Sequence, residues 1–344
     1  MADQFRNLVF EGGGVKGIAY VCAMEVLEGR GVLADIERVG GTSAGAINAT
    51  LFAIGLSVAE QMELLRSMDF RDFMDDDFGV VRDTHRLINE FGWFKGDHFH
   101  DWIGDRLDDK FGYREVTFRD LEETGAPKLY VYGANLSTRF GEVFSAEHTP
   151  TERIADAVRI SMSMPLFFAT VRNARQDVYV DGGLLDNYPA RLFDRRKYIN
   201  EAEQDAMALA RPYYEEENDA FLHAHRGSSP YVYNRQTLGF RLDSAREISV
   251  FRDRREPQHV VIDDFLDYAR ALIGTVLDSQ GNQHLHGDDW QRTVYIDAVG
   301  VSATDFDLDD ETKSKLVDSG RAGATKYFEW FDDENERPVN RAGT

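Results

Sequence analysis

The chain has 344 residues, of which 42% are hydrophobic, and a formal net charge of −22. This length allows two domains or one large α/β unit, and the apolar fraction excludes general disorder. The acidity argues against binding to the phosphates of nucleic acids. The only cysteine, Cys22, leaves no material for a disulfide framework or a cysteine-rich zinc site.

The first 60 residues predict two strand–turn–helix units, which is the pattern of a parallel α/β sheet. In the first unit, a short apolar strand at residues 8–10 meets a glycine-rich turn, and a helix follows over 15–28. In the second unit, a strand at 36–39 meets another glycine-containing turn and a helix over 46–54. The fold class we expect is therefore α/β, with a mainly parallel central sheet.

The rest of the chain predicts further strands and helices of the same α/β unit, together with two segments of different composition. Residues 60–125 are helical, aromatic and acidic, and we expect a cap-like insertion there; the charged residues 194–230 suggest a surface excursion. Further strands are expected at 128–135, 141–145, 177–180 and 293–298, and further helices at 151–162, 260–277 and 310–331. We expect a single domain over 5–331, followed by a polar, frayed tail at 332–344.

The N-terminus has no charged region followed by a long apolar run, so no signal peptide is expected. No stretch reaches the roughly 18 uninterrupted apolar residues of a spanning helix. The sequence therefore predicts a soluble, cytoplasmic protein. Anionic membranes would repel it unless an apolar patch compensates, so peripheral membrane contact stays open.

The second glycine turn has the pattern G-x-S-x-G, in Gly41-Thr42-Ser43-Ala44-Gly45. Between a strand and a helix, small flanking glycines allow a turn sharp enough to raise the serine hydroxyl above the sheet. The helix that follows presents free N–H groups to an anion formed beside the serine. We favour a nucleophilic Ser43 over a purely structural turn, although the bare pattern also occurs in ordinary loops.

The first glycine turn, Glu11-Gly12-Gly13-Gly14-Val15-Lys16-Gly17, formally contains G-x-G-x-x-G, the dinucleotide-binding pattern. That interpretation requires an acid at the end of the second strand, where this chain has glycine, threonine and serine. A phosphate-binding P-loop is disfavoured because Gly17 follows Lys16 where a serine or threonine is needed. An oxyanion hole remains, with the N–H groups of Gly13 and Gly14 as donors and that of Ala44 as a further candidate. A plain tight turn is the alternative.

Asp181 follows an apolar strand directly and is itself followed by Gly182 and Gly183. An acid at a strand end lies where α/β folds gather their active sites, and a serine nucleophile needs a base. Asp181 could accept the proton without a histidine. Asp-Gly-Gly alone, however, is more often a turn than a catalytic base.

Histidines offer two competing interpretations. A Ser-acid-His triad could use His259, His284 or His286, although none of them follows an obvious strand end. The two H-x-H pairs, His98 with His100 and His223 with His225, do not share a helix face, so we expect no metal site there.

Taken together, the three glycine motifs resemble those of the patatin-like phospholipase family, in its bacterial type. Two further segments are similar to that family: S-x-S-x-P at residues 161–165 and N-x-P at 187–189. Residues 295–308 are similar to its usual C-terminal part. The resemblance covers most of 7–330, while 194–230 looks specific to this chain.

The resemblance implies a three-layer α/β/α fold and a lipid acyl hydrolase (phospholipase A or esterase type) that uses no cofactor or metal. It implies a Ser43–Asp181 catalytic dyad, with an oxyanion hole formed by Gly13 and Gly14. Lys16 would either position an acidic head group or be an ordinary solvated residue. The alternative is an effector or regulatory protein whose lipase activity a partner or ligand switches on. A dinucleotide-dependent dehydrogenase is a distant third.

Overall fold

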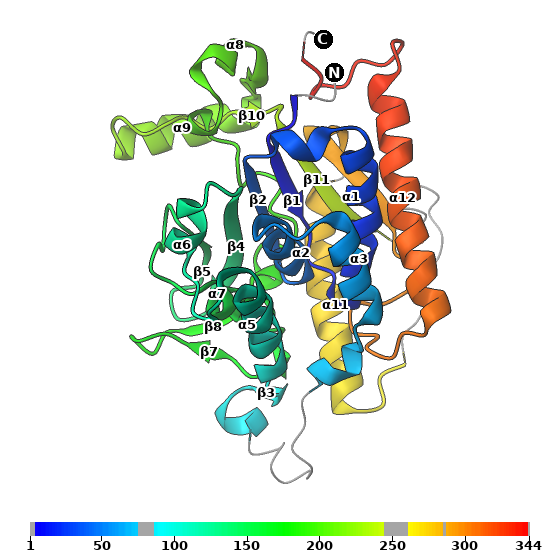
Figure 1. Ribbon diagram of the computed structural model, residues 1–344. Helices are drawn as coiled ribbons and strands as arrows, with labels where there is room; N and C mark the ends of the chain where they lie inside the picture. Colours follow the sequence, from blue (N-terminus) through cyan, green and yellow to red (C-terminus); the bar gives the residue numbers. More distant parts are fainter. Residues whose placement is uncertain (1–3, 75–85, 244–260, 285–286, 343–344) are drawn as a thin grey trace.

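The computed structural model describes residues 4–74, 86–243, 261–284 and 287–342, and its centre is a mixed β-sheet (Figure 1). The sheet has eight strands, in the order β12-β11-β1-β2-β4-β8-β7, with β5 paired to β4. Their bounds are Thr293–Asp297 (β12), Thr237–Asp243 (β11), Asn7–Phe10 (β1), Arg38–Thr42 (β2), Lys128–Asn135 (β4), Val178–Asp181 (β8), Val171–Arg172 (β7) and Phe140–Ser145 (β5). Two small ladders lie outside it: β3 (Gly92–Phe94) with β6 (Leu166–Phe168), and β9 (Ala208–Leu209) with β10 (Tyr233–Asn234).

The strands from β12 to β4 run parallel, and β8, β7 and β5 form an antiparallel margin. Because parallel strands end at the same edge, the turns after β1 and β2 meet there, with Phe10 paired to Gly41. On the other side of β2, Thr42 pairs with Tyr132 of β4 and Gly133 of β4 pairs with Asp181. The two predicted catalytic segments therefore flank the same two residues of β4.

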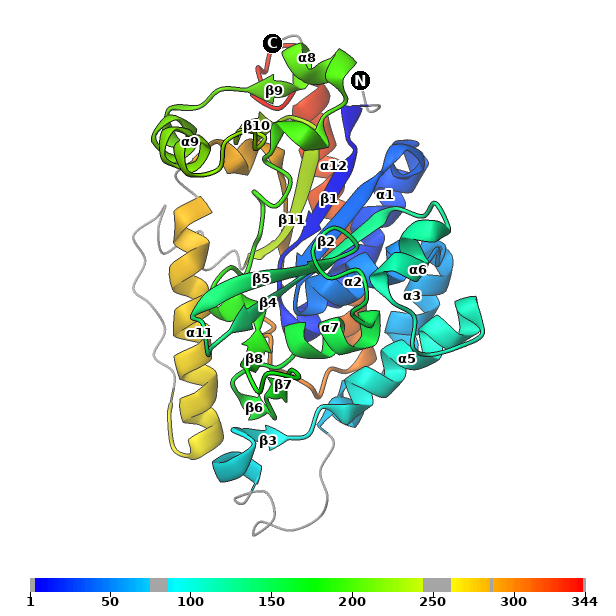
Figure 2. The same cartoon turned by 90° about the vertical axis from the view of Figure 1, so that its left-hand side faces the viewer.

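Ten α-helices surround the sheet within the described ranges. They are α1 (Tyr20–Gly29), α2 (Ala44–Ala53), α3 (Val58–Ser67), α5 (Asp97–Phe111), α6 (Phe118–Glu123), α7 (Ile154–Ser161), α8 (Gln204–Met207), α9 (Pro212–Ala224), α11 (Phe265–His284) and α12 (Asp310–Asp332). Helices α1, α2 and α12 cover one face, and α11 lies on the opposite side (Figure 2). None of the described helices combines the length and the apolarity needed to cross a bilayer.

Side-chain alternation along the strands divides the core between the two faces. Leu8 and Phe10 of β1 belong to the larger cluster beneath the helices, while Val9 belongs to a smaller aromatic cluster with Tyr130 and Phe193 on the other face. Helices cover the larger cluster, and a segment that follows β8 covers the smaller one. The expectation of an α/β fold with a mainly parallel central sheet between layers of helices is confirmed.

Several predicted boundaries shift, and six strands of the described residues were missed: β3, β6, β7, β9, β10 and β11. The strand predicted at 36–39 is β2, which starts at Arg38 and continues through both glycines to Thr42, while the helix predicted from residue 15 begins as a 3₁₀ turn at Gly14–Ala19. Strand β11, which lies between β12 and β1, was not predicted at all. The expectation of a frayed tail is wrong as far as residue 342, because Asn340 is fully buried and donates to the Tyr327 hydroxyl at 2.8 Å.

The described part of residues 60–125 contains most of α3, together with β3, α5 and α6, and most of its aromatic side chains join the main core, while Phe91 and Tyr113 are exposed. Phe73 and Phe99 stack with ring centroids 3.9 Å apart, and both are nearly inaccessible to solvent. Helix α5 packs against α7, and strand β3 pairs with β6. The region is thus continuous with the hydrophobic core rather than a separate lobe resting on it.

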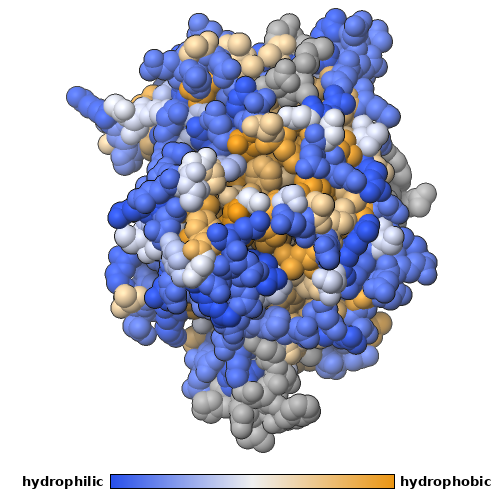
Figure 3. Space-filling view, viewed as in Figure 1, coloured by the Kyte–Doolittle hydropathy of each residue, from blue (hydrophilic) through white to orange (hydrophobic). Residues whose placement is uncertain are grey.

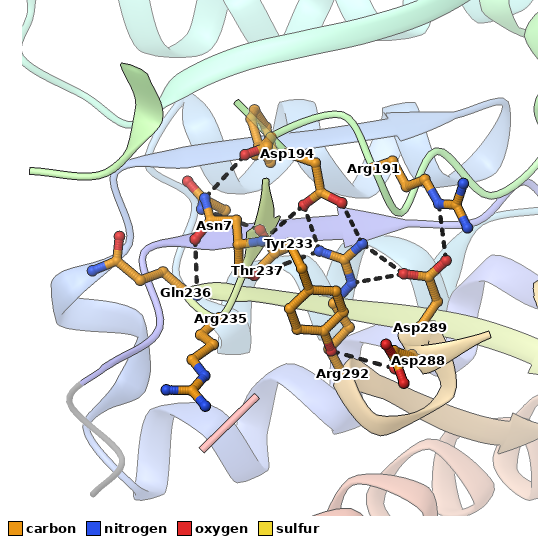
Figure 4. Close-up of polar contacts among 12 residues, drawn as sticks. Asn7, Arg191, Asp194, Tyr233, Arg235, Gln236, Thr237, Asp288, Asp289 and Arg292 are labelled. Carbon is orange, nitrogen blue, oxygen red and sulfur yellow. Dashed lines mark hydrogen bonds and ion pairs between the residues drawn. The ribbon is translucent and has the colours of Figure 1, made fainter. Parts of the chain in front are cut away.

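A buried ionic cluster anchors the excursion formed by 194–230 (Figure 4). Arg292, just before β12, contacts both carboxylate oxygens of Asp194 at 2.6 and 2.7 Å and Asp289 at 2.6 Å. The Tyr214 hydroxyl of α9 also donates to Asp194, and the Tyr233 ring covers the guanidinium at 4.4 Å. All of these groups lie beside the N-terminal ends of β11 and β12, the edge opposite to the Ser43 turn.

Candidate active site

Ser43 lies at the sharp junction between β2 and α2, with backbone angles φ 54° and ψ −125°. A non-glycine residue in this region is strained, as is typical of a nucleophile held above a sheet. The turn can form because Gly45 has no side chain: a Cβ there would lie 2.3 Å from the Phe10 carbonyl oxygen. The last glycine of the G-x-S-x-G pattern therefore permits the sharp turn that the sequence predicts at Ser43.

A second serine fixes the backbone of this turn. The N–H of Ser43 donates to the Ser161 hydroxyl oxygen at 2.8 Å, and that hydroxyl donates to the Tyr132 carbonyl at 2.7 Å. The Ser43 N–H therefore already has an acceptor. The Ser43 side chain is 4% exposed, and its Oγ lies 3.7 Å from the Met162 sulfur.

Asp181, at the end of β8, contacts Ser43 from the other side of β4. Its N–H donates to the Ser163 carbonyl at 2.9 Å, and its Oδ1 accepts from the Gly183 N–H at 2.7 Å. Burial raises the pKa of Asp181 to about 7, and the hydrogen bonds from Gly183 and from the Ser43 hydroxyl lower it only in part. The carboxyl therefore changes its charge near neutral pH, under the influence of the Ser43 hydroxyl.

The first glycine turn lies directly beside Ser43. A Cβ on Gly12 would be 3.1 Å from Ser43 Cβ, and Gly14 has φ +54°, with the Ala303 carbonyl oxygen 1.9 Å from where its Cβ would be. Within the described residues, the N–H groups of Gly13, Gly14 and Ala44 meet no hydrogen-bond acceptor. These amides are therefore available to an oxygen atom brought next to the serine.

The other motif residues support this arrangement without facing the serine. Gly17 allows the first turn to approach α2, since its Cβ would lie 2.9 Å from Ala44 Cβ, and Gly182 lies against the Tyr132 carbonyl. Lys16 is half-buried, and its N–H donates to the Gly13 carbonyl at 3.2 Å. It does not line the pocket next to Ser43.

A narrow apolar pocket opens next to Ser43, with about 540 Å³ of free space including its mouth. Glycine and alanine of the two turns line one end, and the remaining walls are almost entirely apolar. The lining residues are Gly14, Val15, Gly17, Ile18, Ser43, Ala44, Ile47, Asn48, Leu65, Met68, Phe70, Phe73, Phe99, Met162, Met164, Phe168 and Phe306. Part of residues 60–125 thus lines the pocket as well as the core.

The histidine alternatives find no support in the described ranges. His100 Nε2 of α5 lies 2.9 Å from Asp156 Oδ1 of α7. No three histidine, cysteine, aspartate or glutamate side chains of the described residues converge as metal ligands. Of the late candidates for a triad, His259 and His286 lie outside the described residues, and His284 is the last residue of α11, with a side chain outside the described part.

The fold and the glycine motifs define a class. The model of the patatin-like phospholipase family matches residues 8–194, more than half of the chain, which therefore belongs to this family of lipid hydrolases.

The relatives extend the match beyond that region. The Bacillus subtilis protein YqhO is 28% identical over 329 residues, covering 91% of this chain and 94% of its own. A protein of invertebrate iridescent virus 6 named "Probable lipid hydrolase 463L" is 25% identical over 185 residues, 54% of this chain and 62% of its own. Among solved structures, VipD from Legionella pneumophila superposes with a TM-score of 0.55 at 18% identity, covering 95% of this chain and 67% of VipD. At that identity the likeness concerns the fold alone.

Three polar residues that hold the site together were not predicted in that role. Ser161 and Asn187 stand in motifs that the sequence already singled out, but only the folded chain shows which backbone groups they bind. Glu11 precedes the three glycines, and its buried carboxylate accepts from the Leu242 N–H at 2.7 Å. The only indication of these roles in the sequence is the place of the three residues: each adjoins a glycine motif or belongs to a short motif of its own.

Proposed function

We propose that this protein is a lipid acyl hydrolase in which Ser43 and Asp181 form the catalytic dyad. The observation that carries the proposal is the buried Asp181 carboxyl, whose pKa burial raises to about 7 and the Ser43 hydroxyl lowers in part. A general base is most effective when its pKa lies near the working pH. Asp181 meets that condition without a histidine.

In the first step, the ionised Asp181 takes the proton from Ser43 as Oγ attacks the ester carbonyl carbon. The carbonyl oxygen becomes an oxyanion, and the N–H groups of Gly13, Gly14 and Ala44 stabilise it. One such donor is typically worth about 3–4 kcal/mol of the barrier. When the tetrahedral intermediate collapses, the alcohol leaves with the proton from Asp181, and the acyl group stays on Ser43.

In the second step, Asp181 takes a proton from water, and the resulting hydroxide oxygen attacks the acyl-serine carbonyl. The same amides stabilise the second oxyanion. Collapse releases the fatty acid, and the proton on Asp181 returns to Ser43 Oγ. The dyad is thereby restored, and every step uses groups of this chain and water alone.

The pocket beside Ser43 supports an acyl chain as the bound part of the substrate. Its walls are leucine, methionine, isoleucine and phenylalanine side chains, which stabilise apolar groups through the hydrophobic effect. The polar head of the ester would point away from these walls. A medium or long acyl chain should therefore bind more tightly than acetate.

The test compares wild type with Ser43→Ala and Asp181→Asn on p-nitrophenyl esters from acetate to laurate. Both variants should lose at least about 1,000-fold in kcat, as expected when members of a catalytic unit are removed. Ser319→Ala is the matched control, since the Ser319 hydroxyl, on α12, donates to the Asp297 carbonyl at the end of β12 and Ser319 does not line the pocket. Wild-type kcat in Ser43→Ala, or no hydrolysis of any ester by wild type, would refute the proposal.

A further inference from the structure

The carbonyl of Gly12 is held by a side chain outside the proposed dyad. Asn187 lies in the segment after Asp181, is 8% exposed, and donates from Nδ2 to the Gly12 carbonyl oxygen at 3.0 Å. In return, the Gly12 N–H donates to the Asn187 backbone carbonyl at 2.9 Å. Both backbone polar groups of Gly12 are therefore bound to one residue.

This contact also determines the direction of the next amide. The Gly12–Gly13 peptide bond is trans, so its carbonyl and its N–H point in opposite directions within one plane. When Asn187 holds the Gly12 carbonyl, it fixes the orientation of the Gly13 N–H, one of the amides without an acceptor among the described residues. A rotation of that peptide plane would turn the donor away from the oxyanion.

Asn187 also spans the gap between the two halves of the site. Its Oδ1 is 2.3 Å from the position a Cβ would take on Gly12 and 2.8 Å from the equivalent position on Gly183. Neither position tolerates a side chain while Asn187 remains. Because both positions are glycine, the Asn187 side-chain amide fits between the first glycine turn and the turn after Asp181.

The buried carboxylate of Glu11 accepts a hydrogen bond from the same side-chain amide. Glu11 is 5% exposed; its Oε1 accepts from Asn187 Nδ2 at 3.4 Å, and its Oε2 accepts from the Leu242 N–H of β11 at 2.7 Å. The Arg241 guanidinium lies 3.6 Å from Glu11 Oε1 and is itself 6% exposed. Glu11 therefore links the ends of β1 and β11 to Asn187.

We propose that Asn187 is a positioning residue for the hydrolysis, aligning the Gly13 N–H with the oxyanion, and that Glu11 holds the Asn187 amide in place. This inference rests on the proposed function and adds a residue to its machinery. It predicts a specific defect: transition-state stabilisation is lost while binding of the ground state is retained.

The experiment measures kcat, KM and the affinity of a paired set of inhibitors in wild type and Asn187→Ala. The reactive member is an alkyl trifluoromethyl ketone, to which Ser43 Oγ adds while its proton passes to Asp181 and the ketone oxygen becomes an oxyanion. The unreactive member is the matching trifluoromethyl alcohol. In Asn187→Ala, kcat and the affinity for the ketone should fall by about 10–100-fold, whereas KM and the affinity for the alcohol should stay within about threefold.

Two further variants keep the test decisive. Asn187→Leu keeps the branched shape of the side chain but has no hydrogen-bond donor, so it should lose ketone affinity at least as strongly as the alanine variant. Asn234→Ala is the matched control: this buried asparagine holds the Phe193 carbonyl at 3.0 Å at the opposite edge of the sheet. It should lower the melting temperature and leave kcat unchanged.

Unchanged kcat in a folded Asn187→Leu or Asn187→Ala would overturn the inference. So would an equal loss of affinity for ketone and alcohol, because that result indicates a general collapse of the pocket. If wild type itself binds the ketone no better than the alcohol, the proposed function fails instead.

Discussion

At the scale of single residues, Asp181 combines two unfavourable features that a purely structural residue would avoid. It is buried, and its main stabilising contacts are one backbone N–H and one serine hydroxyl. Such an environment penalises the charged form, so the carboxyl remains protonated into the neutral range. Under the proposed mechanism, the same burial sets the pH dependence of activity as well as a local cost in stability.

We predict that kcat/KM rises with pH and levels off above a midpoint of about 7, because only the ionised Asp181 can accept the serine proton. The profile should be measured on a soluble ester whose own ionisation does not change in this range. A profile that is flat down to about pH 5 would contradict the role of Asp181 as the base.

The same pKa makes a prediction about stability. Because the pKa of Asp181 is raised from 3.8 to about 7 on folding, the stability it contributes is present below 3.8 and is lost as the pH rises to about 7. Asp181→Asn keeps the shape without the charge, so it should be more stable than wild type by roughly 2–4 kcal/mol above neutral pH. Chemical denaturation across the pH range should show this difference growing from about pH 4 to about pH 7. A difference that does not change with pH would mean that the carboxyl is not buried in this way.

The strain at Ser43 permits a matched comparison of two variants that both lack the hydroxyl. Ser43→Gly removes the Cβ that disfavours φ 54°, whereas Ser43→Ala retains it. The glycine variant should therefore be the more stable of the two by about 1 kcal/mol, reversing the usual order of these residues. Urea denaturation of both proteins measures the difference. The opposite order would show that the turn is relaxed.

At the scale of elements, the candidate active site and the buried ionic cluster around Arg292 lie at opposite edges of the sheet. The Ser43 and glycine turns occupy the C-terminal edge of the parallel strands, while the Arg292 cluster lies beside the N-terminal ends of β11 and β12 (Figure 4). The cluster ties α9 and the segment around Asp194 to the core through charges that are completely buried. Breaking it should affect stability without a direct effect on catalysis.

Arg292→Ala should lower the free energy of unfolding by about 3–5 kcal/mol, because it leaves Asp194 and Asp289 as uncompensated buried carboxylates. At temperatures where the variant is folded, kcat on a soluble ester should match wild type. Lys315→Ala, which breaks an exposed pair with Glu311 on α12, should leave the melting temperature unchanged. A loss of kcat in folded Arg292→Ala would show that the two edges of the sheet are coupled.

The strands also differ in how well they can be predicted from the sequence. The strands at β1, β4 and β8 and the turns after β1, β2 and β8 are local signals, since an apolar run meets glycine within a few residues. Strand β11 gives no such signal. It contains Gly239, which the Tyr188 hydroxyl approaches, and Arg241, which is buried beside Glu11. One of its partners, β1, is 230 residues away along the chain, and the other, β12, is 54 residues away, so its place in the sheet depends on contacts that local patterns do not encode.

The same distinction holds within the candidate site. Ser43, Asp181 and the glycines could be selected because each follows a strand, and the structure brings them together around Tyr132 and Gly133 of β4. The supporting roles of Ser161 and Asn187 could not be deduced from the chain alone. Their hydrogen bonds cross 118 and 175 residues of sequence, respectively, and exist only once the sheet has formed.

At the scale of the whole molecule, the surface is acidic but not uniform. The chain carries a net charge of −22, yet apolar side chains gather near the centre of the face that α1 and α2 cover, within a hydrophilic rim (Figure 3). A protein with this net negative charge is repelled by anionic lipid surfaces over about 10 Å at ordinary ionic strength. Apolar contact with a neutral lipid surface is not subject to that repulsion.

We therefore predict faster hydrolysis of zwitterionic phospholipid vesicles than of vesicles rich in anionic lipid. Raising NaCl from about 0.05 M to about 0.5 M should narrow the difference, because screening shortens the range of the repulsion. Release of fatty acid from both kinds of vesicle at the two salt concentrations measures the effect. A preference for anionic vesicles at low salt would show that a local basic surface outweighs the total charge.

The most direct measurement of the central claim is intact-protein and peptide mass spectrometry of the enzyme during turnover of a phospholipid mixture, quenched in acid. The account predicts free fatty acid in solution and a transient acyl group on the peptide that contains Ser43. It predicts neither product in Ser43→Ala, and a slower appearance of both in Asp181→Asn. Fatty acid release with the acyl group on another residue, or release that persists in Ser43→Ala, would contradict it.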